Sequence, residues 1–377
     1  MRVAIVTESF LPQVNGVTNT VRHVVDHLLR QGHQPLVVAP GPGLRDYRGV
    51  PVVRVRSMGL PGYRSFPLGL PDDAVEQALA DFRPDVVHLA SPILLGAVGL
   101  RAARRLGIPT LAVYQTDIAG FMRHYGIRAD AVVNRWVGRI HRRADRTLAP
   151  SSASAEQLAA MGVRDVHLWR RGVSLDLFSP QRRNEEVHAR WARSSSLPGG
   201  RVVVGYVGRL AQEKQVRRLA EVARVPGVRL VVIGDGPERG WLQQHIPSAK
   251  FTGMLRGEDL AMAFASLDAF VHTGVHETFC QTVQEAQASG VPVVAPASGG
   301  PLDLVTHGST GLLYDPEDRR SLRRAVAILA GSADLRDQLS TAALAAVEGR
   351  SWASVVEELV AGHYTAVSLP HGLPSAA

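Results

Sequence analysis

The chain alternates short runs of β-branched residues with longer amphipathic segments, and this alternation constrains its fold more than any other feature. The first series of predicted strands comprises Val3–Val6, Pro35–Ala39, Val50–Val55, Asp85–Leu89, Pro109–Tyr114 and Arg146–Pro150. Segments of helical periodicity separate these strands, and Gly32 is placed to end the first of them. Strands that alternate with helices in this way predict βαβ units and a parallel, doubly wound sheet.

The alternation breaks between residues 179 and 200, where Ser, Pro and Gly gather, and then resumes. The second series comprises Val202–Val207, Arg229–Ile233, Lys250–Thr252, Ala269–His272, Val291–Ala295 and Gly311–Tyr314. A chain of 377 residues is long enough for two hydrophobic cores. We therefore predict two Rossmann-like α/β domains, residues 1–180 and 198–350, facing a central crevice. A C-terminal helix of about residues 352–370 is expected to pack back on the first domain.

The basic charge is concentrated in the first half of the chain. Residues 1–193 hold 26 Arg, no Lys and 16 acids, whereas residues 194–377 hold 14 Arg, 2 Lys and 18 acids. A basic face attracts phosphate groups of nucleic acids, anionic lipids or charged small molecules. The helix that contains Trp136, Arg139 and Arg143 is a candidate for contact with an anionic bilayer, and packing within the domain is the alternative.

Cysteine and hydropathy exclude several classes of protein. The only cysteine is Cys280, so a disulfide framework is excluded, and a reducing compartment is expected. The apolar run Val3–Val6 is too short for a signal peptide, and no uncharged apolar stretch is long enough to span a membrane. The sequence also lacks an Asp-x-Asp pair and metal-ligand spacing, so we expect neither a metal ion nor a cofactor.

Two cations follow the first strand of the second domain. Gly208 ends the strand, Arg209 comes next, and Lys214 follows five residues later. At the carboxyl end of a parallel strand, such a pair can clamp a diphosphate. Lysine is informative here because the chain holds 40 Arg and only 2 Lys. The alternative is a solvated helix start with an ion pair between Lys214 and Glu213.

A pair of glutamates lies beside a predicted helix start after strand Ala269–His272. The helix is expected to begin near Phe279, with Glu277 just before it and Glu285 about two turns into it. Free N–H groups at the helix start can hold phosphate oxygens. The spacing argues against an acid/base pair, so we assign Glu277 to sugar hydroxyls and Glu285 to the ribose. Helix capping beside an exposed glutamate is the alternative reading. The other predicted donor contacts in this segment are Thr278, Phe279, Cys280 and Gln281.

Two segments of the first domain and one loop of the second complete the predicted site. Asn15 and Gly16 precede the first helix, where a glycine lets a phosphate or sugar approach the backbone; an ordinary helix-opening turn is the alternative. Gln115 and Asp117 follow strand Pro109–Tyr114, and Asp117 either contacts the acceptor or sugar or caps the next helix. In the second domain, the loop at Met254 and Leu255 is expected to meet a base through backbone groups.

Taken together, these motifs resemble family 4 glycosyltransferases, which are retaining enzymes of the GT-B fold. The resemblance rests on Phe10–Val17, on Gly208-Arg209 with Lys214, and on Glu277 and Glu285 with seven residues between them. Within the family, the segments that begin at Tyr114 and Glu277 look like actinobacterial GDP-mannose-dependent α-mannosyltransferases that act on glycolipids. Much of the family carries His at the position of Gln115 and Gly at that of Cys280.

The resemblance implies roles for the predicted residues. Arg209 and Lys214 would take up charge on the departing diphosphate, while Glu277 positions the sugar, and Asp117 is the fourth catalytic candidate. The acceptor hydroxyl would attack on the face that the nucleotide leaves, without a carboxylate nucleophile. A cytoplasmic enzyme that contacts the inner face of the membrane would transfer mannose from GDP-mannose to a lipid-linked or glycolipid acceptor.

Three alternatives stay open at this point. The donor can be a UDP-hexose used with a soluble acceptor, because base selection depends on the shape of a loop backbone. A sugar-nucleotide epimerase or a phosphorylase can occupy the same two-domain scaffold. A nucleotide-sugar or nucleic-acid binding module is a further alternative. The first half of the chain is poor in aromatic residues and carries no nucleic-acid-binding motif, so no nucleic-acid partner is expected.

Overall fold

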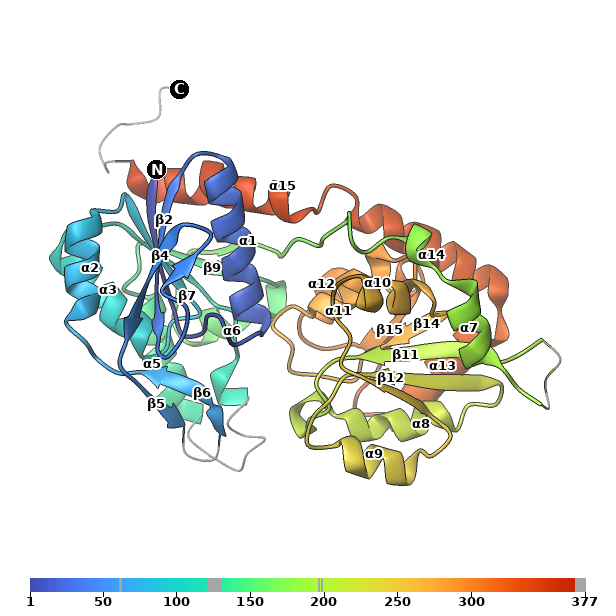
Figure 1. The fold of residues 1–377 in the computed structure, drawn as a ribbon. Helices are drawn as coiled ribbons and strands as arrows, with labels where there is room; N and C mark the ends of the chain where they lie inside the picture. Colours follow the sequence, from blue (N-terminus) through green and yellow to red (C-terminus); the bar gives the residue numbers. More distant parts are fainter. Residues whose placement is uncertain (61–62, 121–129, 196, 198, 370–377) are drawn as a thin grey trace. The chain divides into compact units, whose positions relative to one another are not determined.

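The computed structural model describes residues 1–60, 63–120, 130–195, 197 and 199–369, with the side chains of residues 60–68 left out. The chain forms two compact units (Figure 1). Unit 1 comprises Met1–Gly172 and Trp352–Ala377, and unit 2 comprises Val173–Ser351. Each unit has its own parallel sheet with helices on both faces. The two-domain, doubly wound α/β architecture is therefore confirmed.

Unit 1 is built on an eight-stranded sheet in the order β10-β9-β8-β7-β1-β2-β4-β3. Its strands are β1 (Arg2–Thr7), β2 (Gln34–Pro40), β3 (Asp46–Tyr47), β4 (Val50–Val55), β7 (Val86–Ala90), β8 (Thr110–Val113), β9 (Arg146–Ala149) and β10 (Val166–Leu168). All neighbours pair in parallel except β3 and β4. A separate hairpin joins β5 (Ser57–Leu60) and β6 (Tyr63–Gly69). The sequence analysis missed β3, β10 and this hairpin, which are short or lie at a sheet edge.

Two layers of helices cover the sheet of unit 1. The helices are α1 (Gly16–Arg30), α2 (Ala74–Phe82), α3 (Leu95–Arg105), α5 (Asp130–His141) and α6 (Ser152–Ala160), followed near the C-terminus by α15 (Trp352–Glu357), a π-helical segment η4 (Glu358–Tyr364) and α16 (Thr365–Ser368). Residues of α1 and of the C-terminal helical segment share one core with β1, while α2, α3 and α5 pack on the opposite face. Alternate β1 residues feed the two cores, as the period of a strand requires.

The C-terminal helical segment is fixed to unit 1 by hydrogen bonds as well as by apolar packing. The indole Nε1 of Trp169 donates to the carbonyl oxygen of Val355 over 2.9 Å. His88 Nδ1 lies 2.6 Å from the hydroxyl of Tyr364, and both side chains are buried. A chain segment that follows unit 2 in sequence thus completes the core of unit 1.

We expect Leu359→Ala to lower the free energy of unfolding by about 2–5 kcal/mol, because a fully buried leucine leaves a cavity when it is truncated. Leu359 is 0% exposed in the core under α1. Leu369→Ala is the matched control, since Leu369 is 61% exposed. Urea denaturation of both full-length variants checks this, and equal midpoints would contradict the packing of the segment.

Unit 2 contains a six-stranded, all-parallel sheet in the order β13-β12-β11-β14-β15-β16. Its strands are β11 (Val202–Val207), β12 (Val228–Ile233), β13 (Lys250–Gly253), β14 (Ala269–Val271), β15 (Val293–Pro296) and β16 (Gly311–Tyr314). Strands buried on both faces read as continuous apolar runs, which is why the sequence located them within a few residues. The loops after β11, β12 and β14 all leave the same edge of the sheet.

The helices of unit 2 lie on both faces of this sheet. They are α7 (Glu185–Ala192), α8 (Leu219–Ala223), α9 (Arg239–His245), α10 (Gly257–Ala265), α11 (Gln281–Ala288), α12 (Pro301–Leu304), α13 (Ser321–Gly331) and α14 (Ala333–Val347), with one-turn 3₁₀ segments η1 (Pro180–Arg182), η2 (Gln212–Lys214) and η3 (Val216–Arg218). The core on one face includes α7, α10 and α11, and the core on the other includes α8, α9 and α13.

The segment between residues 179 and 200 differs from the expected linker. It contains η1 and α7, and Val187 and Trp191 of α7 are buried in the core of unit 2. The division between the units therefore falls between Gly172 and Val173, earlier than the predicted boundary at residues 180–198. The polar composition of the segment reflects the exposed face of α7. Within the described parts of the chain, no helix is long and apolar enough to cross a membrane.

Candidate active site

The loops after β11 and β12 pack closely enough to require glycine. Gly208 and Gly234 both have positive φ angles, and a Cβ added to Gly234 would overlap the carbonyl oxygen of Gly208. The amide of Leu210 donates to the carbonyl of Asp235 over 2.9 Å. This contact fixes the backbone from which Arg209 projects at the carboxyl edge of the sheet.

Arg209 and Lys214 are both tied to acidic partners. Arg209 Nη1 lies 3.3 Å from Glu213 Oε1, and Lys214 Nζ lies 2.6 Å from Glu277 Oε1. The alternative of an ion pair between Lys214 and Glu213 is therefore wrong, because Glu213 pairs with Arg209. Lys214 also ends the one-turn segment η2 instead of entering a helix, and Thr273 Oγ1 donates to its carbonyl over 2.6 Å.

The backbone around Glu277 is held by a glycine pair in the following loop. The amide of Gly300 donates to the carbonyl of Glu277 over 2.7 Å. A Cβ on Gly299 would lie 2.7 Å from that same carbonyl oxygen, and one on Gly300 would overlap the backbone of Phe279. Since these approaches exclude larger residues, the loop that presents Glu277 has a defined course.

His272 is a member of this cluster that the sequence analysis missed. Its Nε2 lies 3.1 Å from Glu277 Oε1, and its side chain is 4% exposed. Burial alone raises the pKa of Glu277, but the neighbouring Lys214 and His272 outweigh it and hold that pKa well below its usual range. A polar residue at the end of an otherwise apolar strand, five residues before Glu277, is the signal that could have found it.

Helix α11 begins later than predicted. It starts at Gln281, so Glu285 lies one turn into the helix and not two. Cys280 precedes it with φ +85°, a left-handed conformation that favours glycine. The side chain of Phe279 is buried, which leaves its backbone as the part that can meet a donor, whereas Thr278 and Gln281 are partly exposed. Burial raises the pKa of Glu285 to about 8.

The sequence predicted no cluster of metal-ligand residues, and the structure corrects this point. His272, Glu277 and Cys280 bring one potential ligand atom each within 4.8 Å of one another. However, the ammonium of Lys214 occupies Glu277 Oε1, and it would repel a metal cation there. Burial lowers the pKa of His272, but Cys280 and Glu277 outweigh this effect and raise it to about 10, so the ring is protonated and cannot ligate at neutral pH. The cluster is therefore better described as a carboxylate, Glu277, fixed by two cationic side chains than as a metal centre.

In unit 1, Gly16 is the first residue of α1, as predicted, and Asn15 is its N-cap. The Asn15 carboxamide accepts from the Thr18 amide over 3.0 Å and donates to Ser9 Oγ over 2.7 Å. A Cβ on Gly16 would lie 3.0 Å from Nη1 of Arg171, a buried arginine that the sequence analysis missed. Gly16 therefore allows the guanidinium to approach the start of the helix.

Arg171 also connects this helix start to the segment after β8. Its Nη2 donates to Gln115 Oε1 over 3.2 Å, and Gln115 is 5% exposed. Asp117 Oδ1 accepts from the amide of Gly120 over 2.8 Å, so the predicted capping alternative for Asp117 is realised. Unit 1 thus gathers Asn15, Gly16, Gln115 and Arg171 at the carboxyl edge of its sheet.

The loop after β13 leaves Met254 accessible. Met254 is 60% exposed, and Leu255 is partly buried against the core of unit 2. The Gly234 amide donates to the carbonyl of Gly253 over 2.8 Å, which joins this loop to the one after β12. An exposed, flexible thioether beside fixed backbone groups suits contact with a planar base.

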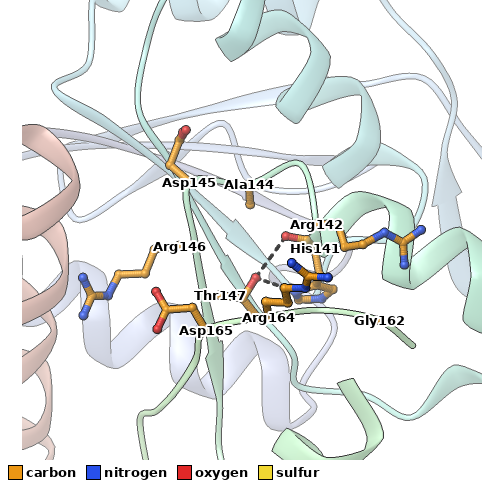
Figure 2. Close-up of a pocket in the computed structure, with 9 residues that line it drawn as sticks. All are labelled: His141, Arg142, Ala144, Asp145, Arg146, Thr147, Gly162, Arg164 and Asp165. Carbon is orange, nitrogen blue, oxygen red and sulfur yellow. Dashed lines mark hydrogen bonds between the residues drawn. The ribbon is translucent and has the colours of Figure 1, made fainter. Parts of the chain in front are cut away.

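A cavity of about 330 Å³ opens at a different place, at the amino end of β9 (Figure 2). Its lining includes His141, Arg146 and Asp165, but none of the predicted site residues. Thr147 bonds to both the ring and the carbonyl of His141, as the dashed lines show. Because amino and carboxyl ends of parallel strands lie at opposite edges, this cavity is separate from the edge that carries Gln115.

Comparison with known proteins agrees with this arrangement of elements. Residues 14–177 match the model "Glycosyltransferase Family 4", and residues 188–345 match "Glycosyl transferases group 1". A GDP-mannose-dependent alpha-mannosyltransferase of Mycobacterium tuberculosis is 52% identical, with 97% of each chain covered. The chain belongs to glycosyltransferase family 4. A protein with the same name from Corynebacterium glutamicum is 43% identical to this transferase over 99% of this chain and 91% of its own.

Solved structures show the same fold at lower identity. HepE of Anabaena in complex with UDP has a TM-score of 0.79 and 20% identity, with 98% of this chain and all of that chain covered. Sucrose-phosphate synthase of Thermosynechococcus elongatus has a TM-score of 0.77 and 18% identity, with 97% and 98% covered. The family 4 transferase therefore has the GT-B fold that its sequence resembles.

Proposed function

We propose that this transferase moves mannose from GDP-mannose to a glycolipid acceptor with retention of anomeric configuration. The observation that carries the proposal is the 52% identity, over 97% of both chains, to a protein named as a GDP-mannose-dependent alpha-mannosyltransferase. A more distant relative, 25% identical, is named for the phosphatidylinositol dimannoside on which it acts. The name of this relative thus supports a phospholipid-linked sugar as the class of acceptor proposed here.

Unit 2 has the groups that a nucleotide-sugar donor needs. Arg209 and Lys214 supply positive charge for the diphosphate at the carboxyl edge of the sheet. Glu277 Oε2 has no hydrogen-bond partner within the described part of the chain, so it is available to sugar hydroxyls. Glu285 in α11 faces the ribose, and the Met254 loop meets the base.

Unit 1 is proposed to hold the acceptor and to contact the donor through Gly16. Gln115, held by Arg171, can bond a hydroxyl but cannot donate a proton as an imidazolium would. Asp117 is engaged as a cap, so its proposed contact would use the oxygen not bonded to Gly120.

The setting of Glu277 disfavours a double displacement through a covalent intermediate, so retention is assigned to attack on the face that the diphosphate leaves. The Glu277 carboxylate is bonded to two cations, which makes it a weak nucleophile. Its position is fixed, so it can still accept a hydrogen bond from a sugar hydroxyl. The bond from the anomeric carbon to the diphosphate breaks while the acceptor oxygen attacks from the same face. The hydroxyl proton passes to the departing phosphate oxygen, whose negative charge Arg209 and Lys214 stabilise.

A donor screen tests this function. The protein is incubated with GDP-mannose, UDP-glucose or GDP-glucose and a total lipid extract, and products are identified by mass spectrometry. Mannosylated lipid is the expected product, and calorimetric titration should show tighter binding of GDP than of UDP. Tighter binding of UDP, or a changed sugar without any acceptor, would support a UDP-hexose transferase or an epimerase instead.

We expect nucleotide binding at pH 7 to release up to about one proton from Glu285, because ribose hydroxyls favour its carboxylate form. Its pKa of about 8 keeps it protonated before binding. Calorimetry in buffers of different ionisation enthalpy measures the release, and Glu285→Gln should abolish that part of it. The folded protein binds this proton more tightly than the unfolded chain, so wild-type stability should fall from pH 4.5 towards 8, and the variant should be more stable at pH 8. Equal proton release in both proteins would contradict the ribose contact.

Membrane contact is proposed to be electrostatic. The apolar face of α5 is already used, since Val137 and Ile140 are buried and Trp136 Nε1 donates to the carbonyl of Ile93. This agrees with the predicted alternative, in which the helix packs within the domain. Arg135 and Arg139 remain exposed on α5 and can face anionic lipid at the inner surface of the membrane.

We expect the double variant Arg135→Glu and Arg139→Glu to reduce binding to anionic vesicles by at least about tenfold, because each basic residue near the surface contributes about 1 kcal/mol. Flotation with vesicles that contain phosphatidylglycerol measures it. Arg319→Glu and Arg320→Glu, exposed in unit 2, form the control pair. Equal flotation with neutral and anionic vesicles would refute the membrane contact.

A further inference from the structure

Glu277 has two cationic partners on a single oxygen, and they differ in accessibility. Lys214 Nζ and His272 Nε2 lie 2.6 and 3.1 Å from Glu277 Oε1. The Lys214 side chain is 31% exposed, whereas that of His272 is 4% exposed. Lys214 can therefore reach a bound donor, while His272 is buried behind the carboxylate.

The loop makes room for the histidine by having no side chain at residue 274. A Cβ on Gly274 would lie 2.8 Å from Glu277 Oε1 and 2.9 Å from His272 Nε2, closer than real Cβ contacts allow. The φ angle of Gly274 is not in the left-handed region, so space and not backbone conformation accounts for the glycine. The contact between His272 and Glu277 thus depends also on a third residue of the same segment, Gly274, which must lack a side chain.

The net effect of the neighbouring ionisable groups favours a protonated His272, although the cation Lys214 opposes it. Cys280 at the start of α11 and Glu277 raise its pKa against the effect of burial. On η2, Glu213 is paired with Arg209, and Lys214 keeps its own proton because Glu277 outweighs burial and raises its pKa. On β11, burial raises the pKa of Tyr206 well above its usual range, so the phenol stays neutral and donates to the carbonyl of Arg209.

We propose that His272 is a positioning residue, which holds Glu277 in place when Lys214 turns to the diphosphate of the donor. This inference rests on the proposed function, in which Glu277 binds the sugar and Lys214 the diphosphate. A diphosphate adds negative charge beside Glu277 and competes for the Lys214 ammonium. The buried imidazolium does not touch the donor, so its bond to Oε1 persists and leaves Oε2 directed to the sugar hydroxyls.

The test compares His272→Leu, which removes both charge and donor, with His272→Gln, which keeps a neutral donor. We expect His272→Leu to lower kcat by about 10- to 100-fold and to weaken GDP-mannose binding, with the Kd of GDP changed less than about twofold. His272→Gln should recover part of the loss. A merely structural role would weaken GDP and GDP-mannose binding alike, and that result would overturn the proposal.

A double-mutant cycle shows whether His272 acts through Glu277. In a Glu277→Gln background, His272→Leu should cost little further in kcat/KM or in the free energy of unfolding. Gly274→Ala should reproduce the selective loss of GDP-mannose binding, while Gly240→Ala, at a position with nothing within 4 Å of an added Cβ, should not. If Glu277→Gln turns over like the wild type, the proposed role of Glu277 fails. If the His272 and Gly274 variants turn over like the wild type while Glu277→Gln does not, only this inference fails. The double-mutant cycle on the free energy of unfolding needs no donor. If it shows no coupling between His272 and Glu277, that result overturns the inference independently of the proposed function.

Discussion

Glu277→Gln is expected to lower kcat by about 10²–10³, a loss of the size seen when one preorganised polar contact to a transition state is removed. The substitution keeps the size of the side chain and removes its charge. The amide would then face the ammonium of Lys214 and the imidazolium of His272, which are 2.6 and 3.1 Å from the present oxygen. The amide oxygen would turn to these two donors, which leaves the amide nitrogen at the position of Oε2. There it cannot accept a hydrogen bond from a sugar hydroxyl, so the contact that holds the sugar is lost.

Stability should suffer less than turnover in this variant. His272 can lose its proton when Glu277 no longer raises its pKa, and Lys214 is partly exposed to water. We therefore expect the free energy of unfolding to fall by about 1–3 kcal/mol, the cost of leaving one buried polar partner poorly satisfied. At neutral pH, circular dichroism and urea denaturation separate this cost from the change in kcat.

Binding measurements locate the defect. Affinity for GDP should change little in Glu277→Gln, because the carboxylate is assigned to the sugar, whereas affinity for GDP-mannose should fall. Glu317→Gln is the matched control, since Glu317 is an exposed glutamate of unit 2 with no side-chain hydrogen bond in the described residues. Near-native turnover of Glu277→Gln would refute the assigned role.

The sequence predicted the two-domain fold because its signals are local and strong. Buried parallel strands such as Val202–Val207 and Gly311–Tyr314 read as apolar runs, and the structure has both with the same bounds. Short edge strands such as β10 and the hairpin β5–β6 give no such run. The α7 segment was misinterpreted as a linker because its helix is short and mostly polar. Its buried face includes only a few apolar residues, such as Val187 and Trp191, which give too weak a helical periodicity to be recognised.

The site was predictable to the extent that its residues follow strands. Parallel strands bring their carboxyl ends to one edge, so Arg209 and Glu277 could be placed together without coordinates. The ion pairs between these cations and acids could not be predicted from the sequence in the same way. Lys214 and Glu277 are 63 residues apart, and which acid each cation selects depends on the course of two loops fixed by glycines. His272 and Arg171 were missed because their partners, Glu277 and Gln115, are identified only by the contacts of the folded loops.

Lys214→Gln is expected to lower kcat/KM by about 10²–10³ and to weaken GDP binding by about 10- to 100-fold, since one charge-assisted hydrogen bond to a phosphate is lost. Affinity for guanosine, which carries no phosphate, should stay the same. The two ligands therefore separate a diphosphate contact from a general distortion of the site.

The chain supplies an unusually close control for this experiment. Lys250 is the only other lysine among 377 residues, and it lies exposed at the start of β13 in the same unit. Lys250→Gln removes the same charge and should leave GDP binding and turnover unchanged. Lys214→Arg should rescue only in part, because a planar guanidinium fork keeps the charge but not the compact donor geometry of the ammonium.

The two largest effects are coupled through the ion pair that joins these residues. In the unliganded protein, Lys214 keeps Glu277 ionised, and its loss leaves His272 as the one remaining cation bonded to that carboxylate within the described residues. Lys214→Gln should therefore weaken GDP and GDP-mannose binding by similar factors, whereas Glu277→Gln weakens only the latter. If Lys214→Gln spared GDP and affected only the sugar nucleotide, Lys214 would serve to hold Glu277, and Arg209 alone would carry the diphosphate charge in unit 2.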